Sequence, residues 1–341
     1  MERLAFICVF DMKLLSCVRH TAPLVCYWSY SQFFLKTGAP CSRLLLSPLD
    51  SRFRGFLYSH RSMSAKSNGA ASNSTHLERT DNSSRQESVT SATVTEISQL
   101  SETVKKLHLK VEDNRFIFKP GQWVDFFIPG VHTVGGFSIC SSPRELKEKS
   151  TIELAVKHSD HRPALWVHTK CIVGSKVHLR VGGDFYFDPS PGDCSPDLLL
   201  VAGGVGINPL YSIVRHVADI STDSQHQYTG KTMLLFSAKN QDELLYKDSL
   251  MEISKTCPSI RCKFFVTKPE NGNCKTGADE IQNTYEHGRI SESRLQEVVS
   301  SLDRSQLICY ICGPPPMIQR MSDILYKLNI AKDRIHFERW W

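Results

Sequence analysis

Apolar positions follow two different periods along the chain. Between residues 92 and 196, apolar and polar residues alternate in three segments: Leu107, Leu109 and Val111; Ile152, Leu154 and Val156; Val177, Leu179 and Val181. A period of two with short turns is typical of antiparallel strands. We therefore expect a small antiparallel β-barrel or sandwich over residues 92–196, with a short helical piece at 164–168.

From residue 197 onward the pattern changes to continuous apolar runs, and the segments between them have apolar residues at helical spacing. The runs cover residues 198–202, 231–237, 262–268 and 307–312. After the first run, Leu210, Ile213, Val214 and Val217 recur at the spacing of one helix face. Strands that alternate with helices form a doubly wound parallel sheet. The fold class we predict is thus two-domain, α+β and α/β, with boundaries at 92–196 and 197–341.

A glycine-rich turn joins the first of these runs to its helix. Such a turn at a helix N-terminus offers backbone N–H groups and the positive end of the helix dipole to a diphosphate. We expect Asn208 to cap the helix and Pro209 to suit its first turn. The alternative is a tight turn without a ligand, since Pro209 stands where the G-x-G-x-x-G pattern has its third glycine. The predicted binding turn comprises Gly203, Gly204, Val205, Gly206, Ile207, Asn208 and Pro209.

Other polar and small residues follow the later runs at corresponding places. In an open α/β sheet, ligands bind at the carboxyl ends of the strands. The further candidates for a nucleotide site are therefore Ser237, Lys239, Thr267, Lys268, Cys312 and Gly313.

Charge is unevenly distributed along the 341 residues. The net charge is +6, and residues 1–63 hold eight Lys or Arg against three acids. Because this segment is also rich in Ser, Leu and aromatics, we expect a mitochondrial targeting segment at 1–63, with a secretory signal as the alternative. Residues 64–91 have almost no large apolar side chain, which predicts a disordered linker. The near-neutral remainder does not indicate nucleic-acid binding. We expect no transmembrane span, because the uncharged stretch at 21–35 is too short and too polar.

Four motifs in order resemble the ferredoxin–NADP reductase superfamily. They are PGQWVDF at 120–126, GFSICSSP at 136–143, LLLVAGGVGINPL at 198–210 and YICGPPPM at 310–317. The resemblance covers residues 92–341. It implies an FAD-binding barrel followed by an NAD(P)-binding α/β domain.

The resemblance places the flavin along residues 135–141. It implies that Phe137 stacks on the flavin ring, that Ser138 lies beside its N5 atom, and that Ile139, Cys140 and Ser141 offer backbone groups. The family arginine that holds the FAD diphosphate falls on Gly135, and a second phosphate-binding serine falls on Ala164. FAD affinity is therefore in doubt. His161, Arg162 and His168 lie nearby as candidate substitutes, with a solvated loop charge as the favoured interpretation of each.

The resemblance also assigns the nicotinamide side and the C-terminus. Cys312 would frame the nicotinamide ring, and Gly313 and Pro314 would leave room for it. Thr267 and Lys268 match a Ser-Arg pair of NADP-specific members, and because lysine lacks the planar guanidinium fork we favour NAD over NADP. At the end of the chain, Trp340 or Trp341 would cover the flavin, and Glu338 would hydrogen-bond Ser138.

The predicted function is an NAD(P)H-dependent flavin oxidoreductase that passes a hydride to FAD and then electrons to an unidentified acceptor, such as a separate protein. No metal site is expected, because the cysteines lack ferredoxin spacing. The alternatives are a nucleotide-binding pseudo-reductase or scaffold with weak or no flavin, and a subunit that lends electrons to another oxidoreductase.

Overall fold

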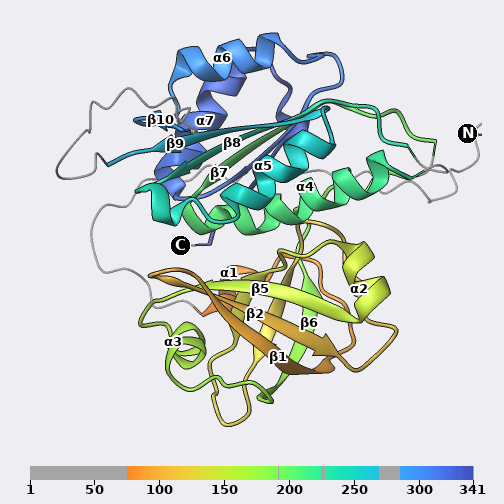
Figure 1. Cartoon of the computed structure of the whole chain (residues 1–341), viewed down its shortest axis with the longest axis vertical. Coiled ribbons are helices and arrows are strands. Elements are labelled where there is room, and N and C mark those ends of the chain that lie inside the picture. Colours follow the sequence, from red (N-terminus) through yellow and green to blue (C-terminus); the bar gives the residue numbers. More distant parts are fainter. Residues whose placement is uncertain (1–74, 191, 224–226, 269–284, 341) are drawn as a thin grey trace, which may run out of the picture. The chain divides into compact units, whose positions relative to one another are not determined.

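The first sheet of the structure is antiparallel and closes on itself (Figure 1). Its strand order is β4-β3-β6-β1-β2-β5. Ile139, just after β4, forms a bridge to Leu154 of β5, so the two edge strands meet. The predicted antiparallel barrel is thus confirmed. The strands are β1 (Thr90–Ser101), β2 (Val104–Val111), β3 (Trp123–Phe127), β4 (Gly135–Ser138), β5 (Thr151–Lys157) and β6 (Lys176–Gly182).

Three short helices accompany the barrel. They are α1 (His76–Arg79), α2 (Pro143–Lys149) and α3 (Arg162–Thr169), of which α3 is the helical piece expected from the sequence. The barrel interior holds the alternating apolar residues of the strands, such as Leu107, Leu154 and Leu179, all fully buried. The period-two pattern therefore predicted which face is internal.

The second sheet is parallel throughout, as predicted. Its order is β10-β9-β8-β7-β11-β12. Its strands are β7 (Leu198–Gly203), β8 (Thr232–Ala238), β9 (Ile260–Val266), β10 (Glu286–His287), β11 (Ile308–Cys312) and β12 (Ile335–Glu338). The helices are α4 (Ile207–Ser221), α5 (Lys247–Thr256), α6 (Glu292–Ser300) and α7 (Pro315–Lys327).

Helices cover both faces of the parallel sheet (Figure 1). Leu198 and Leu200 of β7 pack in one core with α4 and α5, whereas Leu199 and Val201 pack in another with α6 and α7. Because both faces are buried, the strand reads as a continuous apolar run rather than an alternating one.

This computed structural model describes residues 75–190, 192–223, 227–268 and 285–340. The predicted targeting segment at 1–63 lies outside these residues. The described part of the predicted linker, 75–91, is structured instead, with α1 and the start of β1. Its polar side chains form local caps and ion pairs, which a count of apolar residues does not register. Among the described helices, none has the length and hydropathy needed to span a bilayer.

Candidate functional site

The glycine turn between β7 and α4 combines an open position with a closely packed one. Gly204 has φ +54°, and a Cβ atom added there would meet nothing within 4 Å. A Cβ on Gly206, in contrast, would lie 2.3 Å from the carbonyl oxygen of Cys312. Gly206 thus lets α4 approach β11, while Gly204 leaves the turn open to a ligand. The turn is not plugged by side chains.

Asn208 does not cap α4, contrary to the prediction. Gly206 is the N-cap residue, and none of the described side chains caps the helix. The Asn208 amide instead donates to the carbonyl of Ala155 on β5 (2.8 Å), and its oxygen accepts from the Tyr246 hydroxyl (3.2 Å). Pro209 lies in the first turn, as expected. The asparagine thus connects the β7–α4 turn to the barrel.

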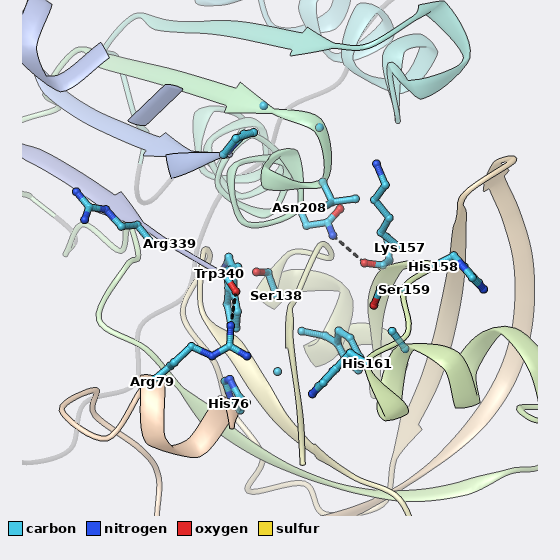
Figure 2. A pocket seen from close by; sticks show the side chains of 18 of the residues that line it. His76, Arg79, Ser138, Lys157, His158, Ser159, His161, Asn208, Arg339 and Trp340 are labelled. Atoms are coloured by element: carbon cyan, nitrogen blue, oxygen red, sulfur yellow. Dashed lines mark hydrogen bonds between the residues drawn. The ribbon is translucent and has the colours of Figure 1, made fainter. Parts of the chain in front are cut away.

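A cavity of about 560 Å³ opens beside this turn (Figure 2). The barrel, α1, the β7–α4 turn and the C-terminal tail all contribute to its wall. Its lining residues are His76, Arg79, Thr80, Gly136, Phe137, Ser138, Ala155, Lys157, His158, Ser159, His161, Ala164, Gly203, Gly204, Val205, Asn208, Pro314, Arg339 and Trp340. The structure therefore brings the predicted flavin and nicotinamide segments together in one cavity.

The wall of this cavity carries only basic ionisable side chains among the described residues. Six of its members are Lys, Arg or His, and none is Asp or Glu. Lys157 forms an ion pair with Glu243, which is not part of the cavity wall; its ammonium lies 3.7 Å from a carboxylate oxygen of that residue. A site with basic groups and without carboxylates suits an anionic ligand.

Phe137 and Ser138 both line the cavity, as the family resemblance implies. The Phe137 ring packs edge-to-face on Phe126, with centroids 5.3 Å apart, so it also belongs to the barrel core. The Ser138 hydroxyl has no hydrogen-bond partner among the described residues and is available to a ligand. At Gly135 a Cβ would lie 2.9 Å from both Phe137 and Pro163, so a longer side chain has no space there.

Each of the next three residues, Ile139, Cys140 and Ser141, has a backbone group that is already bonded within the protein. The Ile139 N–H donates to the Gln122 carbonyl (3.0 Å), and that of Cys140 donates to the Glu153 carbonyl (2.9 Å). The Ser141 carbonyl accepts from Ser212 on α4 (2.6 Å). Closure of the barrel and docking of α4 thus use these three groups, and a flavin contact through the remaining backbone groups stays a prediction.

The C-terminal tail reaches the cavity through Trp340. Its indole stacks on His76 with centroids 5.6 Å apart, and its carbonyl accepts from Arg79 (3.1 Å). The indole N–H donates to Glu338 (2.8 Å), so the bond of Glu338 is to Trp340 rather than to Ser138. Burial raises the pKa of Glu338 to about 8, although hydrogen bonds from Trp340 and Trp123 oppose that shift. Trp341 lies outside the described residues.

Cys312 lies behind the cavity rather than in its wall. It is fully buried at the end of β11. Burial first, and the nearby Glu338 carboxylate second, hold the pKa of its thiol well above the usual range. A protonated thiol suits a packing role and excludes a thiolate nucleophile. Next to it, Gly313 packs against Met317, and Pro314 reaches the cavity wall.

Four more predicted residues lie at the same edge of the sheet, outside the cavity. Ser237 is the second-last residue of β8 and Lys239 directly follows that strand, whereas Thr267 and Lys268 directly follow β9. Thr267 donates through its hydroxyl to the Ala238 carbonyl (3.2 Å), and the Lys268 N–H donates to the Lys239 carbonyl (2.9 Å). These contacts connect the ends of β8 and β9.

Sequence reasoning missed His76 and Arg79, which lie in the predicted linker. The only local signal is the pair Thr75 and Glu78, which forms a capping box at α1. His76 is buried, and its Nε2 lies 2.8 Å from Asp125 Oδ1. Burial by itself would raise the pKa of Asp125, but hydrogen bonds from His76, Arg85 and Arg180 outweigh it and lower the pKa.

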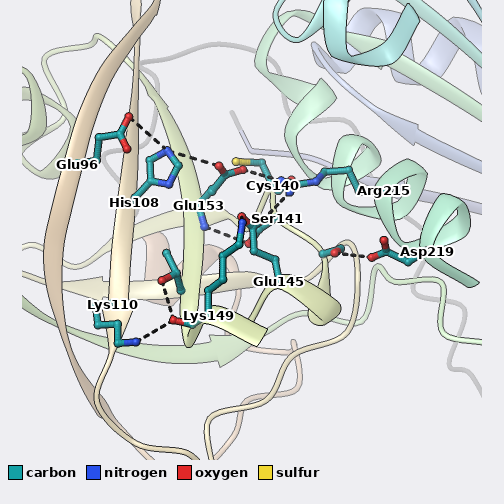
Figure 3. Close-up of polar contacts among 12 residues, drawn as sticks. Glu96, His108, Lys110, Cys140, Ser141, Glu145, Lys149, Glu153, Arg215 and Asp219 are labelled. Atoms are coloured by element: carbon teal, nitrogen blue, oxygen red, sulfur yellow. Dashed lines mark hydrogen bonds and ion pairs between the residues drawn. The ribbon is translucent and has the colours of Figure 1, made fainter. Parts of the chain in front are cut away.

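Ion pairs between α4 and the barrel hold the two walls of the cavity together (Figure 3). Arg215 of α4 donates to Glu153 of β5 (2.6 Å) and to Glu145 of α2. Ser142 donates to Asp219 at the other end of the contact (2.6 Å). These side chains are at most partly exposed, so the ion pairs are largely shielded from solvent.

Comparison with known proteins gives a family match in the parallel sheet. A family model described as the oxidoreductase NAD-binding domain matches residues 200–323. The chain is 51% identical over 269 residues to oxidoreductase NAD-binding domain-containing protein 1 of Danio rerio, covering 78% of this chain and 97% of that protein. Its counterpart in Homo sapiens is 46% identical over 271 residues, covering 78% and 84%.

Solved structures share the whole two-sheet arrangement. One is the ferredoxin NADP+ reductase of Neisseria gonorrhoeae with bound FAD and NADP (TM-score 0.58, 18% identity, covering 74% of this chain and 99% of that chain). Another is the FAD/NAD binding domain of a nitric oxide dioxygenase from Vibrio cholerae (TM-score 0.58, 18% identity, 74% and 98%). At this identity the likeness shows the fold, which is that of the ferredoxin–NADP reductases.

Proposed function

The chain belongs to the family of oxidoreductase NAD-binding domain-containing protein 1, and from this premise we propose that it is a flavin-dependent NAD(P)H oxidoreductase. The observation that carries the proposal is the single cavity into which the β7–α4 turn, Ser138 and Trp340 all face. A reductase of this kind needs a nicotinamide nucleotide and a flavin in contact, because a hydride moves only between adjacent rings.

The residues present fit a flavin dinucleotide in three respects. The cavity has aromatic surfaces in Phe137 and Trp340, an uncommitted hydroxyl in Ser138, and basic side chains for a diphosphate. When bound, the flavin supplies the redox chemistry by accepting a hydride equivalent from the nicotinamide. The Neisseria gonorrhoeae reductase, which shares this fold, holds FAD and NADP in its crystal structure.

The chain's own residues bind and orient. Gly204 and Val205 offer open backbone to the diphosphate of the nicotinamide nucleotide. Ser138 offers a hydrogen bond to the flavin ring. The neutral Cys312 thiol and Gly206 keep β11 and α4 in contact behind the nicotinamide. Lys268 in place of a planar arginine fork favours NADH over NADPH.

Spectroscopy of the purified full-length protein tests the proposal. We expect absorption in the visible blue, retained on desalting or restored by added FAD, and bleached anaerobically by NADH. Ser138→Ala should slow bleaching about tenfold, the loss expected for one hydrogen bond to the ring. Ser159→Ala, which changes a second serine in the same cavity, is the control. Bleaching at an equal rate in both variants would contradict the role of Ser138.

A second candidate is a nucleotide-binding protein without reductase activity. Two observations favour it: no side chain fits at Gly135, and the Ile139 and Cys140 N–H groups are already bonded. A colourless protein that binds NADH but gives no FAD titration would support this alternative and contradict the reductase.

A further inference from the structure

We propose that Arg79 of α1 and His161, the residue before α3, together clamp the diphosphate of the flavin dinucleotide. The proposal rests on the proposed flavin-dependent function. It assigns a binding role to the segment that precedes the barrel, which the sequence alone predicts to be a disordered linker.

Arg79 carries a charge that no described carboxylate compensates. Its Nη1 donates to the Trp340 carbonyl (3.1 Å) and its Nε to the Thr75 carbonyl (3.5 Å). Both partners are neutral, and Nη2 has no partner among the described residues. Both N–H groups of Nη2 therefore remain available to phosphate oxygens, with which a guanidinium forms charge-assisted hydrogen bonds. Arg79 is thus oriented in advance at the cavity wall.

His161 lines the same cavity as Arg79, on the side where α3 begins (Figure 2). Burial first, and then the charges of Arg79 and His76, lower the pKa of its imidazole. A bound diphosphate would offset the charge of Arg79 and favour the protonated imidazole of His161, because the described wall of the cavity has no carboxylate to do so. His76 is not such a group, because its ring is bonded to Asp125.

The other cations near the cavity are committed elsewhere. Lys157 pairs with Glu243, and Arg339 stacks on the Phe337 ring, 4.9 Å from its centroid. The His158 ring contacts the His168 ring edge-to-face, with centroids 5.1 Å apart. His168, a substitute suggested by the sequence, is bonded through Nε2 to the Val156 carbonyl (2.9 Å) and lies outside the cavity wall. The clamp also has to come from outside β4, since Gly135 has no space for a side chain.

The experiment compares flavins with and without the diphosphate. FAD and riboflavin are titrated into the full-length protein and followed by flavin fluorescence, and NADH is titrated separately. The variants are Arg79→Gln, Arg79→Lys and His161→Gln. Arg339→Gln is the matched control, because it removes a different cation from the same cavity wall. Arg79 is exposed, so the fold should tolerate its replacement, and circular dichroism checks this.

We expect Arg79→Gln to weaken FAD binding about 10- to 100-fold, as the loss of a charge-assisted contact does. Arg79→Lys should recover part of that loss, and His161→Gln should weaken FAD binding by less. Riboflavin and NADH affinities, and all affinities of Arg339→Gln, should stay within about twofold of the wild type.

Two results would overturn the clamp while leaving the reductase intact. One is FAD affinity unchanged in both Arg79→Gln and His161→Gln. The other is an equal loss of FAD and riboflavin affinity, which would mean that Arg79 shapes the ring site. A wild type that binds neither flavin but binds NADH would overturn the proposed function and the clamp together.

Discussion

At the scale of single residues, two glycines of the β7–α4 turn are needed for different physical reasons. Gly204 is a conformational requirement, because its φ of +54° disfavours other residues. Gly206 is a packing requirement, because its Cα approaches the Cys312 carbonyl so closely that no Cβ fits. The distinction gives a pair of variants with separable outcomes.

Gly206→Ala should lower the free energy of unfolding by about 3 kcal/mol, since α4 must move away from β11 to relieve the overlap. The same movement misaligns the turn, so NADH affinity should fall sharply. Gly204→Ala meets open space and costs about 1 kcal/mol through its backbone conformation. Urea unfolding and an NADH titration measure both. Unchanged NADH affinity in Gly206→Ala would contradict the assignment of the turn.

Glu338 should make the free energy of unfolding fall as the pH rises, which is the opposite of the usual effect of a carboxylate. Its pKa is raised from 4.5 to about 8 on folding, so between these values the folded state binds more protons than the unfolded state. Stability from this group is therefore complete below the unfolded pKa and is lost as the pH rises through about 8.

Glu338→Gln tests this, because a neutral amide still accepts the Trp340 indole hydrogen bond but does not titrate. Unfolding free energies measured across that pH range should decline less steeply in the variant than in the wild type. Parallel declines in the two proteins would show that another group is responsible.

At the scale of elements, α4 joins the two sheets. It covers one face of the parallel sheet and carries Ser212 and Arg215 to the barrel. Glu153 is largely buried, and its pKa is lowered because Arg215, Lys106 and His108 together outweigh the effect of burial. The ion pair of Arg215 with Glu153 is therefore present as charges.

Arg215→Gln should lower the free energy of unfolding on the order of 3 kcal/mol, because it leaves the buried Glu153 with fewer partners. It should also loosen the cavity, whose two walls this contact fixes. Arg294→Gln, which breaks ion pairs with the more exposed Glu286 and Glu297, should have little effect. Equal effects of the two variants in chemical unfolding would show that the docking of α4 does not depend on Arg215.

The sequence predicted the elements that depend on local pattern. Alternation identified β2, β5 and β6, and apolar runs identified β7, β8, β9 and β11, because burial on one face or on two leaves a visible period. The turn at Gly203 was predictable because its glycines directly follow an apolar run. The α1 contacts were not, since Arg79 meets Trp340 across 261 positions and no local period encodes that pairing. The Asn208 contact with the barrel was missed for the same reason.

At the scale of the whole described unit, its first helix and its last described residue close the cavity together. His76 is the link: its ring is bonded to Asp125 in the barrel, contacts Trp123 edge-on (centroids 4.9 Å apart) and stacks on Trp340. A single imidazole thus contacts the barrel and the tail that follows the parallel sheet. The cavity depends on this contact as well as on α4.

Two variants should release this link from opposite sides. His76→Ala removes the ring, and Gly136→Ala places a Cβ where the ring now lies, 2.2 Å from its nearest atom. Each should lower stability by about 1–3 kcal/mol, the value of a buried, hydrogen-bonded aromatic contact. Hydrogen exchange should then speed up in residues 75–80 and 335–340 but stay unchanged in β8, which lies inside the parallel sheet. The two substitutions have only the displacement of the His76 ring in common. Matching exchange patterns in the two variants would therefore show that His76 keeps the cavity closed. Protection retained at residues 335–340 in both variants would show instead that β12 alone holds the C-terminal tail.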